Sequence, residues 1–260
     1  MQIKSESLRY FIELSYNGKN FFGWQIQPKE ISVQETIEKS LSTLLRQTIS
    51  IIGAGRTDTG VHARKLFAHF DFDENLPEDL LHRLNSFLPK DIFISRIFPV
   101  KPSAHARFDA LERTYHYLVQ IGKNPFNYNS AWQIHQDLDI KKMNEAAVFL
   151  LGKQDFSSFA KLHTDVKTHI CDVKQAVWTK ETDWNENEFL KFQITADRFL
   201  RNMVRSIVGT LVDVGRNKIS IEEFQQIIHQ KDRKFASGSA PAQGLYLYNV
   251  TYPNSIFENE

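Results

Sequence analysis

The chain lacks several features that would restrict its class. It has a single cysteine, Cys171, which excludes an internal disulfide framework. No apolar run approaches the roughly 20 residues that a membrane-spanning helix needs. Residues 1–10 contain no apolar secretory segment. We therefore expect a cytoplasmic protein with no membrane association.

An excess of charge of one sign is also missing. The 32 basic and 31 acidic side chains leave a formal net charge of +1, which neither requires nor excludes a polyanionic partner. The length of 260 residues and the 42% hydrophobic content allow one large core or two smaller ones. Any interaction with nucleic acid must then depend on where the basic side chains lie.

Hydrophobic periodicity predicts an α+β fold. Apolar residues alternate in some segments, as in strands, and recur at helical spacing in others. Two helix starts carry the Ser-x-x-Glu pattern of a capping box, at Ser32 and Ser220. The predicted helices are 32–45, 77–87, 139–150, 199–214 and one from 220 onward. The predicted strands are 8–16, 49–52, 66–72, 115–121, 173–178, 189–196 and 245–252.

The order of these elements indicates two similar α/β halves. We expect an N-terminal half over residues 1–108 and a C-terminal half over residues 109–260. They would share a mixed, largely antiparallel sheet with helices packed on it and an active-site cleft between the halves. The segment 237–244 consists almost wholly of small residues, which allow backbone to approach a ligand closely.

The sequence GAGRTDTGVHA, residues 53–63, concentrates reactive side chains between two predicted strands. Its first two glycines resemble the start of a dinucleotide-binding loop. Asp58 occupies the third glycine position, however, where its charge would repel phosphate. The following segment also alternates like a strand where that motif needs a helix. The pattern therefore argues against a nucleotide cofactor.

Metal binding is a second interpretation of this region. Imidazole and carboxylate groups recur at alternate strand positions after the loop, and such donors hold divalent ions. The spacing favours a solvated row of polar residues opposite the apolar positions, and hence no metal site. The residues concerned are His62, His69, Asp71 and Asp73.

Asp58 itself has two interpretations. An ionised aspartate beside Arg56 can act as a nucleophile or as a base, because the guanidinium favours the charged form and can hold phosphate. The same aspartate can also cap the backbone of Thr59 and Gly60 in an Asx turn. Residue type alone leaves both interpretations open.

The loop resembles the GRTDxGVHA motif of the bacterial TruA family of tRNA pseudouridine synthases. Gly53 and Thr59 differ from the cysteine and alanine that many members carry, but Asp58 is retained. The similarity extends in order over nearly the whole chain. The further segments that carry it are Phe22-Gly23-Trp24-Gln25, His105-Ala106-Arg107-Phe108, Arg113-Thr114-Tyr115-His116-Tyr117, Phe199-Leu200-Arg201-Asn202-Met203-Val204-Arg205 and Gly244-Leu245-Tyr246-Leu247.

This resemblance implies an isomerase that converts uridine to pseudouridine at positions 38, 39 and/or 40 of the tRNA anticodon stem-loop, on a base flipped out of the stack. It implies that Asp58 is the essential carboxylate, without deciding whether Asp58 attacks C1′, attacks C6 or removes a ribose proton. Arg56 would take the place of the extruded base, Tyr115 would stack on it, and Leu245 would form an apolar wall. Arg205 would pair with the catalytic aspartate.

The resemblance further implies a homodimer that needs no metal and no cofactor. RNA recognition would depend on shape and phosphate contacts, so that affinity falls steeply with salt. The spacing of Arg198, Arg201 and Arg205 predicts that they share one helix face. The candidate phosphate ligands are Arg64, Lys65, Arg107, Arg113 and Arg201.

Two other classes compete with this hypothesis. The chain could be an RNA-binding module or tRNA chaperone in which Asp58 is structural. It could also be a metal-dependent phosphohydrolase that uses His62, His69 and Asp71. The first hypothesis predicts that replacing Asp58 leaves tRNA modification unchanged. The second predicts that a chelator abolishes the activity.

Overall fold

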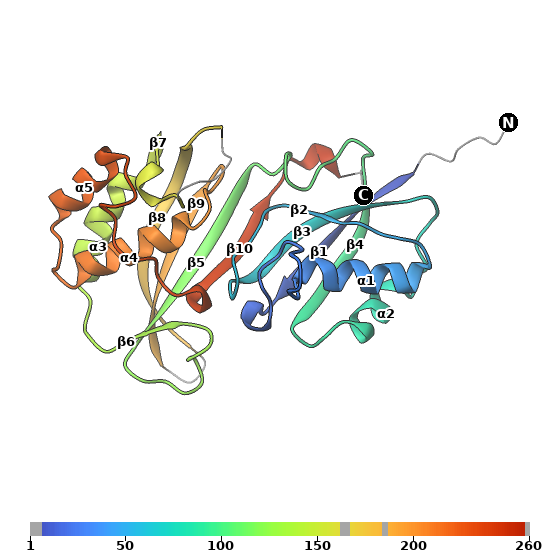
Figure 1. Ribbon diagram of the computed structural model, residues 1–260, viewed down its shortest axis with the longest axis horizontal. Helices are drawn as coiled ribbons and strands as arrows, with labels where there is room; N and C mark the ends of the chain where they lie inside the picture. The colour runs from blue at the N-terminus through green and yellow to red at the C-terminus, as the bar shows by residue number, and fades with distance from the viewer. Residues whose placement is uncertain (1–6, 162–166, 184–186, 258–260) are drawn as a thin grey trace. The chain divides into compact units, whose positions relative to one another are not determined.

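The computed structural model describes residues 7–161, 167–183 and 187–257, and its contacts divide the chain into two units (Figure 1). Unit 1 comprises Met1–Leu111 and Leu247–Glu260, and unit 2 comprises Glu112–Tyr246. Each unit combines helices with a mostly antiparallel sheet, which confirms the α+β class. Among the described residues, no helix is long and apolar enough to cross a membrane.

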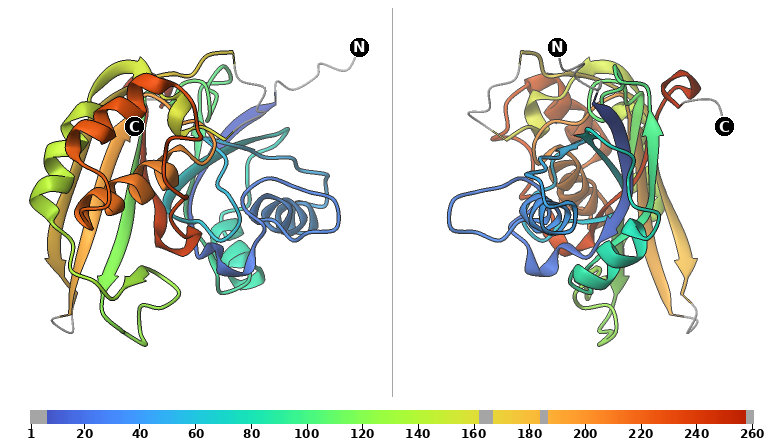
Figure 2. Two further views of the ribbon diagram at one scale, coloured as in Figure 1. Left: turned by 60° about the vertical axis from the view of Figure 1, so that its left-hand side comes forward. Right: turned by 90° about the vertical axis from the view of Figure 1, so that its right-hand side faces the viewer.

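The sheet of unit 1 has the strand order β4-β1-β3-β10, and β2 pairs with β3. Helices α1 and α2 lie on one face of this sheet (Figures 1 and 2). The helix bounds are Val33–Leu45 for α1 and Leu80–Phe87 for α2. The strand bounds are Leu8–Tyr16 for β1, Ile52–Gly53 for β2, His62–Phe72 for β3, Ile92–Val100 for β4 and Leu245–Thr251 for β10.

The predicted boundaries in unit 1 need three corrections. The strand expected at 49–52 is reduced to the two residues of β2, and β3 begins at His62 instead of residue 66. The helix expected from Pro77 begins at Leu80, whose N–H donates to the Pro77 carbonyl at 3.0 Å. Strand β4 was not predicted. The helix expected at residue 32 is confirmed, since the Ser32 side chain accepts the Glu35 N–H.

Both faces of the unit 1 sheet are buried. The alternation of β1 places Ile12 and Leu14 on one face of the sheet and Phe11 on the other, and all three side chains are buried. The Phe11 ring packs against the rings of His69 and Tyr252, with centroids 6.0 and 5.5 Å away. His69 is only 3% exposed. The prediction that His69 belongs to a solvated polar row is therefore wrong, because this face carries a second layer of side chains.

The sheet of unit 2 has the strand order β5-β9-β8-β7, all antiparallel, and β6 pairs parallel with β5. Helices α3, α4 and α5 lie together on one of its faces (Figures 1 and 2). The helix bounds are Ile140–Ala147 for α3, Met203–Gly215 for α4 and Ile221–Gln230 for α5. The strand bounds are Glu112–Ile121 for β5, Trp132–Ile134 for β6, Gly152–Asp155 for β7, Ile170–Thr182 for β8 and Glu188–Ala196 for β9.

Helix α4 starts four residues later than the predicted residue 199. Asn202 has φ of 65° and ψ of 1°, a left-handed conformation that Asn tolerates better than most residues and that stops helix growth toward the N-terminus. Arg198 and Arg201 therefore precede the helix, and the prediction that they share a helix face with Arg205 is wrong. The capping box at Ser220 and Glu223 is confirmed.

Candidate active site

Asp58 lies in a tight turn that begins the path into β3. The Val61 N–H donates to the Asp58 carbonyl at 3.1 Å, and Gly60 has φ of +77°. A positive φ at the third residue is the requirement of a type II turn, so Gly60 suits this position. Asp58 is half-buried and Arg56 is exposed. The turn therefore holds the carboxylate at a defined point while the guanidinium extends from the loop.

The residue before Asp58 is fixed by the last residue of β1 and by the segment that follows this strand. The Tyr16 hydroxyl and Thr57 Oγ1 lie 2.7 Å apart, and the Trp24 N–H donates to the Thr57 carbonyl at 3.2 Å. Gly23 has φ of +85°, and a Cβ there would lie 2.4 Å from the Thr57 carbonyl oxygen. This close approach explains why glycine precedes Trp24.

The far side of the same turn is fixed as well. The Gly60 N–H donates to the Phe21 carbonyl at 3.3 Å. His62 is buried, and its Nδ1 accepts the Gly18 N–H at 3.0 Å. A Cβ at Gly18 would lie 2.0 Å from the Val61 carbonyl oxygen. Residues 18–24 thus hold the loop by hydrogen bonds on both sides of Asp58, and His62 accepts one of these bonds.

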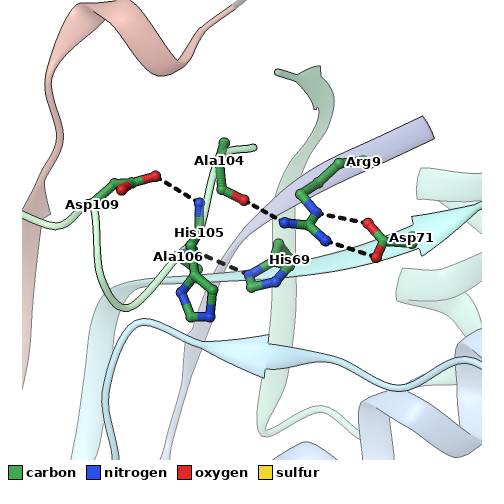
Figure 3. A network of polar contacts seen from close by, with 7 residues as sticks. All are labelled: Arg9, His69, Asp71, Ala104, His105, Ala106 and Asp109. Atoms are coloured by element: carbon green, nitrogen blue, oxygen red, sulfur yellow. Dashed lines mark hydrogen bonds and ion pairs between the residues drawn. The ribbon is translucent and has the colours of Figure 1, made fainter. Parts of the chain in front are cut away.

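Two more of the side chains considered as metal ligands, His69 and Asp71, are engaged with protein groups (Figure 3). Arg9 donates to the two Asp71 carboxylate oxygens at 2.7 and 2.8 Å, and this bond holds the pKa of Asp71 below its usual value. His69 Nδ1 accepts the Ala106 N–H at 3.1 Å. Burial, and then the charge of Arg9, lower the pKa of His69 to about 4. Across the described residues, no three such side chains group as metal ligands would.

Tyr115 lies in β5 and is partly exposed, whereas Tyr117 on the same side of the strand is completely buried. The Phe199 ring meets the Tyr115 ring edge to face, with centroids 5.0 Å apart and planes at 85°. Such a contact restricts the orientation of a ring without covering both of its faces. Tyr117 therefore belongs to the core. Tyr115 lies at the margin of the core, where Phe199 holds its ring in place.

Arg205 is fixed by the loop of small residues. Its Nε donates to the Ala240 carbonyl at 2.6 Å, and the Ala240 N–H donates to the Arg205 carbonyl at 2.9 Å. One turn along α4, a Cβ at Gly209 would lie 2.0 Å from the Gly238 carbonyl oxygen. The small residues predicted to approach a ligand thus also allow the loop to lie directly on the helix.

Leu245 follows this loop and is 6% exposed. The preceding Gly244 packs on the Tyr117 ring so closely that a Cβ at this glycine would lie 2.7 Å from the nearest ring atom. The Tyr117 hydroxyl donates to the Pro241 carbonyl at 2.8 Å. The loop therefore contacts both α4 and β5. Within unit 2 it links the elements that carry Tyr115, Arg205 and Leu245. Asp58 and Arg56 belong to unit 1.

The five candidate phosphate ligands differ in exposure. Lys65 is partly exposed, and its ammonium lies 3.7 Å from the Glu13 carboxylate. Arg113 is partly buried, and its Nη1 donates to the Asp197 carbonyl at 2.9 Å. The other candidates are exposed: Arg64, Arg107 and Arg201.

Several residues that build these sites were not singled out from sequence. Tyr16 and Thr57 position Asp58, and Phe199 positions Tyr115. A signal existed for one of them, since Phe199 stands in a segment that resembles the family. No local pattern indicates the bond between Tyr16 and Thr57, which are 41 residues apart.

Comparison with known proteins gives one consistent result. A model of a family described as tRNA pseudouridine synthase matches residues 14–109 and 146–253. The relatives below are each named tRNA pseudouridine synthase A. That of Bacteroides fragilis is 53% identical over 252 residues, 96% of this chain and 98% of the relative. Those of Bacteroides thetaiotaomicron and Parabacteroides distasonis are 52% and 51% identical, over 97% of this chain and 93% and 99% of the relatives.

Proposed function

This chain belongs to the tRNA pseudouridine synthase family, and from that membership we propose that it modifies one or more of uridines 38, 39 and 40 in the tRNA anticodon stem-loop. Members are isomerases that act on tRNA. The reaction breaks the bond between N1 of uracil and C1′ of ribose and forms a bond between C5 and C1′. The C5–H bond also breaks and N1 gains a proton, so no atom is gained or lost overall. The reaction needs a carboxylate near C1′ and C6, a pocket for the freed base and protection from water.

The observation that carries the proposal is the fixation of Asp58. Its neighbours on both sides are tied to residues 18–24, and the side chain is half-buried. A carboxylate that reacts with a nucleoside must be held in the productive geometry before substrate arrives. The turn around Asp58 meets that requirement with main-chain hydrogen bonds, which persist when the side chain is changed.

We assign the remaining roles by the chemistry of each group. A uridine within a stem must leave the stack before it can react. The exposed guanidinium of Arg56 is planar and can fill the vacated position. The partly exposed ring of Tyr115 stacks on the extruded base. Arg205 and Leu245 bind the substrate, and the enzyme acts as a homodimer without metal or nucleotide cofactor.

The test is to map pseudouridine in an anticodon stem-loop RNA incubated with the purified chain and no additive. Asp58→Asn keeps the shape and removes the charge, and Asp58→Ala removes the carboxylate. We expect both variants to form no pseudouridine and to retain most of their tRNA affinity. Asp137→Asn, which changes an exposed aspartate, serves as the matched control and should remain fully active.

Three outcomes would count against the proposal. Unchanged modification by Asp58→Ala would make the aspartate structural and favour an RNA-binding module. Loss of the wild-type activity in excess chelator would favour a metal-dependent enzyme. Pseudouridine at a position outside the anticodon stem-loop would retain the reaction and reject the proposed sites.

A further inference from the structure

The turn at residues 104–109 is fastened to the sheet of unit 1 from several directions (Figure 3). Arg9 Nη1 donates to the Ala104 carbonyl at 2.9 Å. The Ala106 N–H donates to His69 Nδ1, and the Ala106 carbonyl accepts the Tyr252 hydroxyl at 2.5 Å. Both alanines are buried. The backbone of this turn is therefore held by β1, by β3 and by the residue that follows β10.

Hydrogen bonds within the turn complete its shape. The His105 N–H donates to an Asp109 carboxylate oxygen at 2.7 Å, and the Asp109 N–H donates to the His105 carbonyl at 3.1 Å. His105 Nδ1 accepts the N–H groups of Arg107 and Phe108 at 3.1 and 3.2 Å. The Asp109 carboxylate thus faces back into the turn, and the imidazole nitrogen is an acceptor.

Phe108 stands at the apex of this fixed turn with 74% of its surface exposed. One side of its ring rests on the His105 ring, with centroids 4.2 Å apart and planes at 30°. The Arg107 guanidinium lies 5.8 Å from the centre of the same ring. Burial, and then the charge of Arg9, lower the pKa of His105 and so favour the uncharged form of its ring. The result is an aromatic pair with a cation beside it.

A single exposed phenyl ring on a protein surface needs no explanation. Phe108 differs because its backbone is held rigid and because a cation lies beside its ring. Protein interfaces are also enriched in aromatic residues and in Arg. RNA-binding surfaces combine aromatic rings, on which unpaired bases stack, with basic side chains that follow the phosphates. Because members of this family act on tRNA, the occupant that this turn fits is a single-stranded nucleotide.

We infer that Phe108 is a stacking site for an unpaired base of the tRNA, with Arg107 at the adjacent phosphate. This site would bind substrate away from the reacting uridine and contribute affinity without taking part in bond making. The inference rests on the proposed function for the identity of the RNA. Asp58 and Phe108 separate the two claims, because the first is needed for modification and the second for binding.

The experiment compares the equilibrium affinity of four variants for unmodified tRNA. Phe108→Ala and Phe108→Leu both remove the stacking ring, and Leu keeps an apolar side chain. We expect each to weaken binding by about 10-fold, in the range measured for loss of one base–aromatic stack. Phe108→Tyr keeps the ring and should bind like the wild type. Phe87→Ala removes another exposed phenyl ring, 55% exposed on α2, and should also bind like the wild type.

Steady-state kinetics and crosslinking complete the test. Phe108→Ala should raise KM by the same factor and leave kcat unchanged, and tRNA substituted with 4-thiouridine should crosslink to the segment 104–109. Unchanged affinity in both Phe108→Ala and Phe108→Leu would overturn the inference. A change of oligomeric state in Phe108→Ala would overturn it in favour of contact with a second copy. If wild-type protein makes no pseudouridine but binds tRNA through Phe108, the proposed function fails and the stacking site stands.

Discussion

At the scale of single residues, the site depends on glycines that allow backbone to approach backbone. Gly23 carries two constraints at once, a φ of +85° and a contact with the Thr57 carbonyl. We expect Gly23→Ala to reduce kcat/KM at least 10-fold, because the new methyl group must push Thr57, and with it Asp58, out of place. The left-handed backbone adds a loss of about 1–2 kcal/mol in the free energy of unfolding.

Gly122→Ala is the control that separates these effects. Gly122 has φ of +77°, but a Cβ there meets no atom within 4 Å. Urea unfolding should show a loss of similar size from backbone strain, with pseudouridine formation unaffected. If Gly122→Ala and Gly23→Ala reduce activity equally, strain and not displacement of the Asp58 loop is responsible.

His69 gives a pH-dependent prediction at the same scale. Its pKa of about 4 in the folded protein is below the ordinary value of 6.5. As the pH falls from about 6.5 toward 4, the unfolded chain takes up a proton that the folded protein does not. The contribution of His69 to stability is therefore fully present above pH 6.5 and decreases in this window by at most about 1.4 kcal/mol per pH unit. Burial lowers the pKa of His116 to about 4 as well, so both residues contribute.

His69→Asn tests this contribution, because the asparagine oxygen can accept the Ala106 N–H in place of Nδ1. The free energy of unfolding, measured in urea from pH 7 to pH 5, should fall less in His69→Asn than in the wild type. His135→Asn alters an exposed histidine and should retain the wild-type slope. Identical slopes in all three proteins would show that His69 is protonated equally in both states.

The types of residue in the sequence indicated the chemistry of the site better than they indicated which side chains are buried. The resemblance of residues 53–63 to a family motif pointed to Asp58, and the structure adds how its turn is held. His69 was misjudged, since alternation indicates only which residues share a face of a strand. Whether that face meets water depends on residues 101–111 and Tyr252, which are distant in sequence.

At the scale of elements, the packing of the 237–244 loop on α4 predicts the opposite effect of a Gly→Ala substitution from the one that helix propensity predicts. Gly→Ala within a helix normally stabilises by about 1 kcal/mol. At Gly209 the new Cβ would lie 2.0 Å from the Gly238 carbonyl oxygen, and such overpacking costs about 1–3 kcal/mol. We expect Gly209→Ala to destabilise the protein in urea unfolding. It should also reduce kcat/KM, because displacing the loop moves Ala240 away from Arg205.

The neighbouring Gly238→Ala is the matched control, since a Cβ at Gly238 meets no atom within 4 Å. It should change neither stability nor activity appreciably. Stabilisation of the protein by Gly209→Ala would mean that the loop yields readily and does not fix Arg205.

Helix starts and ends show what local sequence can predict. The caps at Ser32 and Ser220 were found because a short side chain satisfies the first N–H groups of the helix. The late start of α4 was missed because apolar spacing continues unbroken through residues 199–202. The chain departs from the helix there through the backbone conformation of Asn202, which hydrophobic periodicity does not report.

At the scale of the whole molecule, strand pairing joins parts of the chain that periodicity treats separately. Residues 247–260 belong to unit 1 together with residues 1–111. Most strands could be recognised locally, although β4, β6 and β7 were not, and the pairing partners of the strands could not be recognised. Tyr252, which closes over Ala106, illustrates the consequence, since these residues are 146 positions apart. A site built from such contacts can be located by family resemblance before its geometry can be derived.

The balanced net charge of +1 gives the last prediction. An overall field cannot attract tRNA to such a chain, so binding must depend on local phosphate contacts, each of which releases counterions. Arg107→Gln should reduce the slope of log affinity against log salt by about 0.7–0.9, measured between about 50 and 200 mM. Lys141→Gln, in an exposed part of α3, should leave the slope unchanged. Phe108→Ala should weaken binding equally at every salt concentration, because a stacked base releases no counterion. If Phe108→Ala reduces the salt slope and Arg107→Gln does not, the roles proposed for these two neighbouring residues are reversed.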